Sequence, residues 1–146
     1  MIRVDRLSKT FRDGERVHEV LSDLSLEVRE GEFIALLGRS GSGKSTLLNC
    51  LAGIETPDRG EIQLDGRPIT TLDDDSRTRL RRDSIGIVFQ FFNLLPVVPV
   101  IDNVLLPAEL AGRGGAAARD RALRLLDELE LGSRAQELPD HLSGGE

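Results

Sequence analysis

The chain has 146 residues, enough for one domain with a hydrophobic core, and its composition of 39% hydrophobic and 30% charged residues is ordinary for a globular protein. Its formal net charge of −6 gives no basic surface, so we expect no nucleic-acid partner. No stretch is long and apolar enough to cross a membrane. The single cysteine, Cys50, excludes an internal disulfide, and we expect it to be a buried thiol beside a helix.

The N-terminal part of the chain predicts a small antiparallel β-subdomain. Apolar and polar residues alternate over residues 2–7, 17–21 and 24–28, which is typical of half-buried strands. We expect a turn over residues 8–14 between the first two strands. A further short strand over residues 61–66 ends in an Asp-Gly turn.

Two continuous apolar runs, residues 33–37 and 85–89, predict buried strands of an α/β core, because parallel strands covered on both faces lack polar alternation. A third apolar segment, residues 91–99, contains Pro96 and Pro99 and is therefore not a strand. Such a segment suits contact with a protein partner. Packing inside the domain is the alternative.

Three helices are expected besides the one that follows residue 44. One runs from Asp73 to about Arg82, with its acids first and its arginines last, as the helix dipole favours. The next runs from about Asp102 to Leu110. The last ends at Gly132 and has one apolar face. That face is formed by Ala118, Ala122, Leu125 and Leu129.

The stretch between the first apolar run and the next helix carries the clearest chemistry. It consists of Gly38, Arg39, Ser40, Gly41, Ser42, Gly43, Lys44, Ser45 and Thr46. A strand, a glycine-rich turn, Lys-Ser and a helix, in this order, are the setting of a phosphate-binding P-loop. The glycines let consecutive amides face an anion, Lys44 supplies a cation to the β and γ phosphates, and Ser45 is placed to bind Mg²⁺. The alternative is an ordinary Gly/Ser loop.

Further stretches resemble the ATP-binding-cassette (ABC) ATPases. Gln90 follows the second apolar run, residues 142–146 are similar to the family's signature motif, and Phe11 stands where the family places an aromatic residue against adenine. The resemblance covers the whole chain and points to the ATP-binding subunit of an ABC transporter. Residues 89–95 and 102–104 look most like the lipoprotein-releasing and macrolide-export branch.

This resemblance implies a role for each matching residue. Phe11 would stack on the adenine of ATP, and Gln90 would bind Mg²⁺ and orient the attacking water. Ser143, Gly144 and Gly145 would donate hydrogen bonds to the γ phosphate held by the other protomer of a homodimer. The apolar segment would meet a transmembrane permease subunit, which would place the protein in the cytoplasm on the inner face of the cell membrane. The alternatives are a turn hydrophobe at Phe11, a strand-ending amide at Gln90 and a plain Ser-Gly-Gly turn.

The sequence departs from the family pattern at its end. Glu146 replaces the usual Gln and puts an acid near the phosphate site unless it points away. In the family a helix follows the signature, and the acids that hold Mg²⁺ and polarise water come later, as does a switch histidine. We therefore expect residues 1–146 to be the N-terminal part of an ABC nucleotide-binding domain, incomplete at its C-terminus.

Two expectations follow from that reading. Residues 1–146 alone should bind ATP without hydrolysing it. The apolar runs 33–37 and 85–89 should lack the strands that lie between them in the family, so we expect either a gap between them or a pairing unlike that of the family. The exposed edges and apolar faces should make the chain prone to aggregate.

Two rival functions remain open from the sequence. A non-transport ABC protein of DNA repair or translation would carry tandem cassettes or large insertions, and the sequence shows neither. A non-hydrolysing nucleotide-binding remnant is the second rival. The sequence names neither the transported substrate nor the direction of transport.

Overall fold

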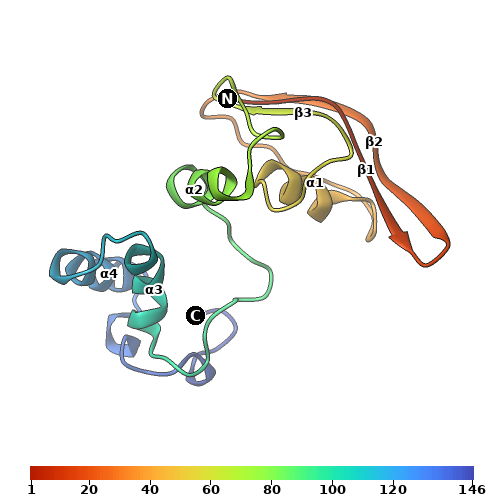
Figure 1. Ribbon diagram of the computed structural model, residues 1–146. Helices are drawn as coiled ribbons and strands as arrows, with labels where there is room; N and C mark the ends of the chain where they lie inside the picture. The colour runs from red at the N-terminus through yellow and green to blue at the C-terminus, as the bar shows by residue number, and fades with distance from the viewer. The chain divides into compact units, whose positions relative to one another are not determined.

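The computed structural model describes residues 1–146 and consists of two compact units, Met1–Ile87 and Val88–Glu146. The first unit contains the sheet with helices α1 and α2, and the second contains helices α3 and α4 (Figure 1). Each unit has a hydrophobic core of its own. None of the helices is long and apolar enough to span a bilayer.

A four-stranded antiparallel sheet in the order β2-β1-β3-β4 forms the frame of the first unit. Its strands are β1 (Ile2–Asp13), β2 (Arg16–Val28), β3 (Arg59–Leu64) and β4 (Arg67–Pro68). Figure 1 shows β1 and β2 side by side as a long hairpin, with α1 next to it. The expected N-terminal antiparallel subdomain is confirmed.

The turn expected over residues 8–14 is wrong. The strand β1 continues through this stretch, because Thr10 pairs with Glu19 and Phe11 pairs with His18 across the hairpin. The register shifts between Val4 and Thr10, so irregular pairing there replaces the turn that the composition suggested. The two strands expected over residues 17–28 are accordingly one strand, β2.

Neither apolar run is a strand. Residues 33–37 and 85–89 pair with no other segment, and their side chains are largely exposed, as the values of 93% for Phe33 and 100% for Val88 show. A buried strand needs hydrogen-bonded neighbours and a covering layer, and the four strands of this sheet pair only with one another. The predictions that these runs are strands and that they are buried are therefore wrong. Aggregation stays a prediction.

The core of the first unit lies between the sheet and α1 (Lys44–Leu51). Leu47 and Cys50 of α1 pack with apolar residues of the strands and of the segment after β4. Those residues are Val4, Leu7, Leu21, Ile62 and Ile69. This packing fixes α1, and with it the residues that precede α1, against β1 and β2.

The buried thiol expected at Cys50 is confirmed, since this free cysteine is 1% exposed. Burial raises the pKa of the Cys50 thiol, and the nearby charge of Glu55 adds to that effect. We predict that a maleimide labels Cys50 at least about tenfold more slowly in buffer than in denaturant, because labelling requires local opening. Mass spectrometry of timed samples measures the two rates, and similar rates would mean that the folded chain exposes Cys50.

The helix α2 (Asp74–Ser84) begins where the sequence predicts. Asp73 is its N-cap, and the Asp73 carboxylate accepts a hydrogen bond from the Ser76 amide at 2.8 Å. Hydrogen bonds from the Ser76 side chain and amide lower the pKa of Asp73. Arginines occupy the last turn, so the expected charge order along this helix is confirmed.

The helix α3 (Val100–Leu110) of the second unit begins just before the expected Asp102. The Asn103 side chain ties the preceding apolar segment to this helix. Its Oδ1 accepts a hydrogen bond from the Leu95 amide at 2.7 Å, and its Nδ2 donates to the Leu95 carbonyl at 3.1 Å. The end of the segment after Gln90 is therefore fixed by a polar side chain.

The apolar face expected for α4 (Ala116–Glu128) is partly wrong. Ala122 and Leu126 are buried against α3, whereas Leu125 and Leu129 are exposed. The helix also ends at Glu128 rather than at Gly132, because Glu130 has a left-handed backbone with φ of 61°. Two short 3₁₀ helices, η1 (Gly132–Arg134) and η2 (Pro139–His141), lead to the end of the chain.

Candidate nucleotide-binding site

The loop of residues 38–46 runs directly into the N-terminus of α1. Gly41 and Gly43 have φ of 79° and 85°, values that residues with a side chain rarely adopt. Gly43 is the N-cap of α1, and no acidic residue lies in the first turn of that helix. The backbone therefore has the form that a phosphate loop requires.

The first amides of α1 have no acceptor in the backbone. The Leu47 amide bonds to the Gly43 carbonyl at 2.8 Å, whereas the amides of Gly43, Lys44, Ser45 and Thr46 donate to no backbone carbonyl. These amides gather at the positive end of the helix dipole. Such a set of free donors suits the oxygens of a phosphate group.

Lys44 places its ammonium group over the loop itself. Its Nζ donates to the carbonyls of Gly38 at 2.9 Å and Arg39 at 2.8 Å, and it lies 3.4 Å from the Ser42 Oγ. Lys44 takes part in no ion pair. An anion entering the loop would thus meet a cation whose charge no carboxylate already neutralises.

The loop is packed against β2, which also pairs with the strand that carries Phe11. A methyl group added to Gly43 would come within 2.8 Å of the Val20 carbonyl oxygen. Phe11 pairs with His18, two residues along β2 from Val20, so the Cα atoms of Phe11 and Val20 lie roughly 8 Å apart. A base on Phe11 and phosphates in the loop would therefore be neighbours.

Phe11 lies in a strand, so its alternative reading as a turn residue is wrong. Phe11 is 42% exposed and belongs to neither hydrophobic core. An aromatic ring with free surface near a phosphate loop can accept a stacked base. The role of Phe11 toward adenine stays a prediction.

The residues that could hold Mg²⁺ divide between the two units. The exposed Ser45 lies beside Lys44 at the start of α1 and fits as one ligand, because Mg²⁺ at nucleotide sites takes one or two side chains together with phosphate oxygens. No group of three or more His, Cys, Asp or Glu could hold a metal by itself. Gln90 is exposed and belongs to the second unit, so its predicted role as a ligand remains untested.

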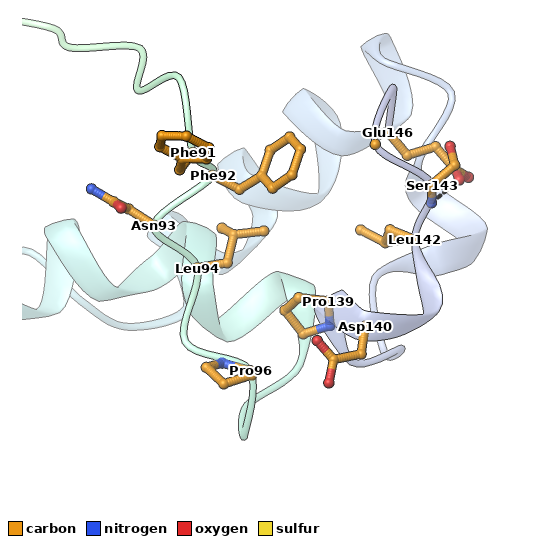
Figure 2. A pocket seen from close by; sticks show the side chains of 11 residues that line it. Phe91, Phe92, Asn93, Leu94, Pro96, Pro139, Asp140, Leu142, Ser143 and Glu146 are labelled. Carbon is orange, nitrogen blue, oxygen red and sulfur yellow. Dashed lines mark hydrogen bonds between the residues drawn. The ribbon is translucent and has the colours of Figure 1, made fainter.

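The apolar segment after Gln90 and the signature residues line one hollow of about 430 Å³ in the second unit (Figure 2). Phe92 and Leu142 point into this space from the two segments. The Phe92 Cζ would lie 3.9 Å from a methyl group on Gly144, so the two segments are close. The rings of Phe91 and Phe92 remain exposed, which leaves an apolar surface at the mouth of the hollow.

Glu146 points back toward the signature turn. Its carboxylate accepts a hydrogen bond from the Ser143 amide at 2.8 Å and lies 3.5 Å from the Arg134 Nε. The spacing Ser-x-x-Glu with this bond is half of a capping box, which Gln can form equally well. The Ser143 amide lowers the pKa of Glu146, and the charge of Arg134 adds to this. The Ser143 amide is thus already bonded, whereas those of Gly144 and Gly145 donate to no backbone carbonyl.

Sequence reasoning missed Lys9, which is only 9% exposed. Its Nζ donates to the Thr56 carbonyl at 2.7 Å and pairs with Glu55 at 2.7 Å and with Asp58 at 3.8 Å. Burial by itself lowers the pKa of Lys9, but the hydrogen bond and charge of Glu55 and the charge of Asp58 outweigh burial and raise it. The alternation of Leu7, Lys9 and Phe11 on β1 was the available signal, because it puts a charge on the inward face of a strand.

Comparison with known proteins decides the family. The ABC transporter family matches residues 21–146, which include the phosphate loop, Gln90 and the signature. The chain belongs to the ABC transporter family. Within it, the chain is an ATP-binding domain, as the resemblance of its motifs predicted.

Several relatives resemble the chain along nearly its whole length. An uncharacterized ABC transporter ATP-binding protein of Mycobacterium tuberculosis is 48% identical over 146 residues, and the chain spans 59% of its length. The lipoprotein-releasing system ATP-binding protein LolD of Paramagnetospirillum magneticum is 45% identical over 99% of the chain, which covers 64% of LolD. The macrolide export ATP-binding/permease protein MacB of Brucella abortus is 45% identical over the full chain, which covers 23% of MacB. The predicted lipoprotein-releasing and macrolide-export branch is confirmed.

The fold also matches a solved ABC cassette. The ATP-binding cassette MJ0796, described as dimeric in a post-hydrolysis state bound to ADP and Pi, is 41% identical to the chain. The TM-score is 0.91, over 99% of this chain and 64% of MJ0796. The predicted α/β fold class of an ABC cassette is therefore confirmed.

Proposed function

We propose that the chain binds Mg²⁺-ATP in the loop of residues 38–46, as part of the ATP-binding subunit of an ABC transporter. The observation that supports this most strongly is the set of unbonded amides at the start of α1, together with the Lys44 ammonium group held on the carbonyls of the same loop. The adenine would lie on Phe11, which shares the β1–β2 hairpin with the residue that contacts Gly43.

Each part of the loop has a distinct task in this proposal. The amides of residues 43–46 hold phosphate oxygens, and Lys44 exchanges the carbonyls of Gly38 and Arg39 for the β and γ phosphates. Ser45 offers its hydroxyl oxygen to Mg²⁺, which when bound neutralises part of the triphosphate charge. In the whole subunit, Gln90 would be a further ligand of this ion and would orient water for hydrolysis.

The whole subunit would couple ATP hydrolysis to export or extraction of a substrate through a transmembrane permease. The apolar rim of Phe91 and Phe92 offers a surface for that permease. In a homodimer, the amides of Gly144 and Gly145 would contact the γ phosphate of the partner subunit. MJ0796 is described as dimeric and MacB carries its own permease, which supports both partners. The subunit would work in the cytoplasm, at the inner face of the cell membrane.

Replacing Phe11 tests the adenine part of the proposal. We expect Phe11→Ala to weaken ATP binding by about tenfold, because a stacked base contributes about 1–3 kcal/mol. Binding of inorganic triphosphate should not change, since it has no base. Isothermal titration calorimetry with both ligands measures the difference.

The matched control is Phe33→Ala, which removes another exposed phenyl ring from the first unit. It should leave the affinity for both ligands unchanged. A similar loss of ATP and triphosphate affinity in the Phe11→Ala chain would contradict a role in base binding.

A further inference from the structure

The ammonium group of Lys9 lies over the ring of Phe11. The two residues are neighbours on the same face of β1, and the Lys9 Nζ is 5.2 Å from the ring centroid. Cation–π attraction operates within about 6 Å of an aromatic ring. Phe11 belongs to neither hydrophobic core, so the contact with the Lys9 ammonium group can set the orientation of its ring.

Lys9 is itself anchored by the segment that follows α1. Glu55 and the Thr56 carbonyl each lie 2.7 Å from the Nζ. Asp58 is also bonded to β1, because its Oδ2 accepts a hydrogen bond from the Thr10 amide at 2.6 Å. Glu55 and Thr56 therefore fix the position of the ammonium group independently of the orientation of the Phe11 ring.

We propose that Lys9 is a positioning residue for the base of ATP, holding one face of the Phe11 ring so that the other face is presented to adenine. The inference rests on the proposed function, because it assumes a base on Phe11. A ring that turns freely must lose that freedom when the base stacks, whereas a ring already held by Lys9 loses less. Lys9 thus acts through Phe11 and does not touch the base.

A single-tryptophan chain makes the stacking visible. The sequence contains no Trp and no Tyr, so Phe11→Trp introduces the only strong fluorophore at the proposed platform. Adenine stacking should quench this tryptophan, and inorganic triphosphate should not. Adding Lys9→Met to Phe11→Trp removes the cation and keeps a side chain of similar length. We expect the Kd for ATP to rise about threefold to tenfold, with the Kd for triphosphate, measured by calorimetry, unchanged.

Matched variants separate positioning from support of the fold. Lys9→Arg keeps a cation over the ring and should restore the affinity for ATP to within about twofold. Glu55→Gln keeps Lys9 but weakens its anchor, so it should give an intermediate loss. Lys9→Met in the Phe11→Ala chain should cause no further loss, because the ring that Lys9 positions is gone. Circular dichroism of each variant reports whether it is folded.

Several results would overturn the inference. An equal loss of ATP and triphosphate affinity would make Lys9 a support of the fold only, and so would an undiminished effect of Lys9→Met in the Phe11→Ala chain. Tighter ATP binding by Lys9→Met would show that the ammonium group occupies the face that the base needs. Failure of the parent chain to bind either ligand is a different result, because it would overturn the proposed function and this inference with it.

Discussion

The Lys44→Ala chain should lose ATP affinity by about a hundredfold or more, because two charge-assisted hydrogen bonds to phosphate contribute about 1.5–3 kcal/mol each. The Lys44 ammonium group lies on the carbonyls of Gly38 and Arg39 and takes part in no ion pair. Moving this ammonium group to the phosphates therefore breaks no ion pair. Titration calorimetry with Mg²⁺-ATP measures the loss.

Arg79→Ala is the control for a change in net charge. Arg79 is exposed on α2 in the same unit, so its replacement removes one positive charge without touching the loop. This variant should bind ATP like the parent chain. Equal affinities of the Lys44→Ala chain and the parent chain would contradict a phosphate role for the loop.

Gly43→Ala should destabilise the first unit by about 3 kcal/mol and abolish measurable ATP binding. The new methyl group would come within 2.8 Å of the Val20 carbonyl, and the backbone φ of 85° is unfavourable for alanine. The backbone of Val20 is held from both sides, because its neighbours Glu19 and Leu21 pair with β1, so the start of α1 must move instead. Urea unfolding followed by circular dichroism measures the change in stability.

Gly41→Ala separates the clash from the backbone strain. Gly41 has a similar φ of 79°, but a methyl group there meets nothing within 4 Å. We expect it to cost only about 1 kcal/mol. If Gly41→Ala and Gly43→Ala changed the free energy of unfolding equally, the packing of the loop against β2 would be of no consequence.

The position of the glycine-rich loop before a helix could be predicted because it depends on residues that are close in the sequence. Glycine spacing and the Lys-Ser pair determine where amides and a cation meet, and the structure shows Lys44 and the free amides of α1 together. The start of a helix near Asp73 could be predicted for the same reason, because the Ser76 amide that this carboxylate accepts from is in the first turn.

Features that depend on distant residues could not be predicted in the same way. An apolar run such as residues 33–37 indicates that a strand is favoured, but its burial depends on neighbours that periodicity does not identify. On α4, the predicted apolar face included Leu125, whereas packing against α3 buries its neighbour Leu126 instead. Glu146 could have faced either way until Ser143 and Arg134 were located around it.

The site illustrates the same limit of local reasoning. Phe11 was found by resemblance, whereas Lys9 was missed because its partners Glu55 and Asp58 are distant in the sequence. A charged residue on the inward side of a strand is a weak signal until the acids that pair with it are located.

Amide chemical shifts of the ¹⁵N-labelled chain, recorded during titration with Mg²⁺-ATP, test the phosphate loop most directly. We predict the largest shifts at Gly43, Lys44, Ser45 and Thr46, whose amides are unbonded at the start of α1. Smaller shifts should appear at Phe11 and its neighbours on β1. Binding of ATP that left these four amides unshifted would contradict the account.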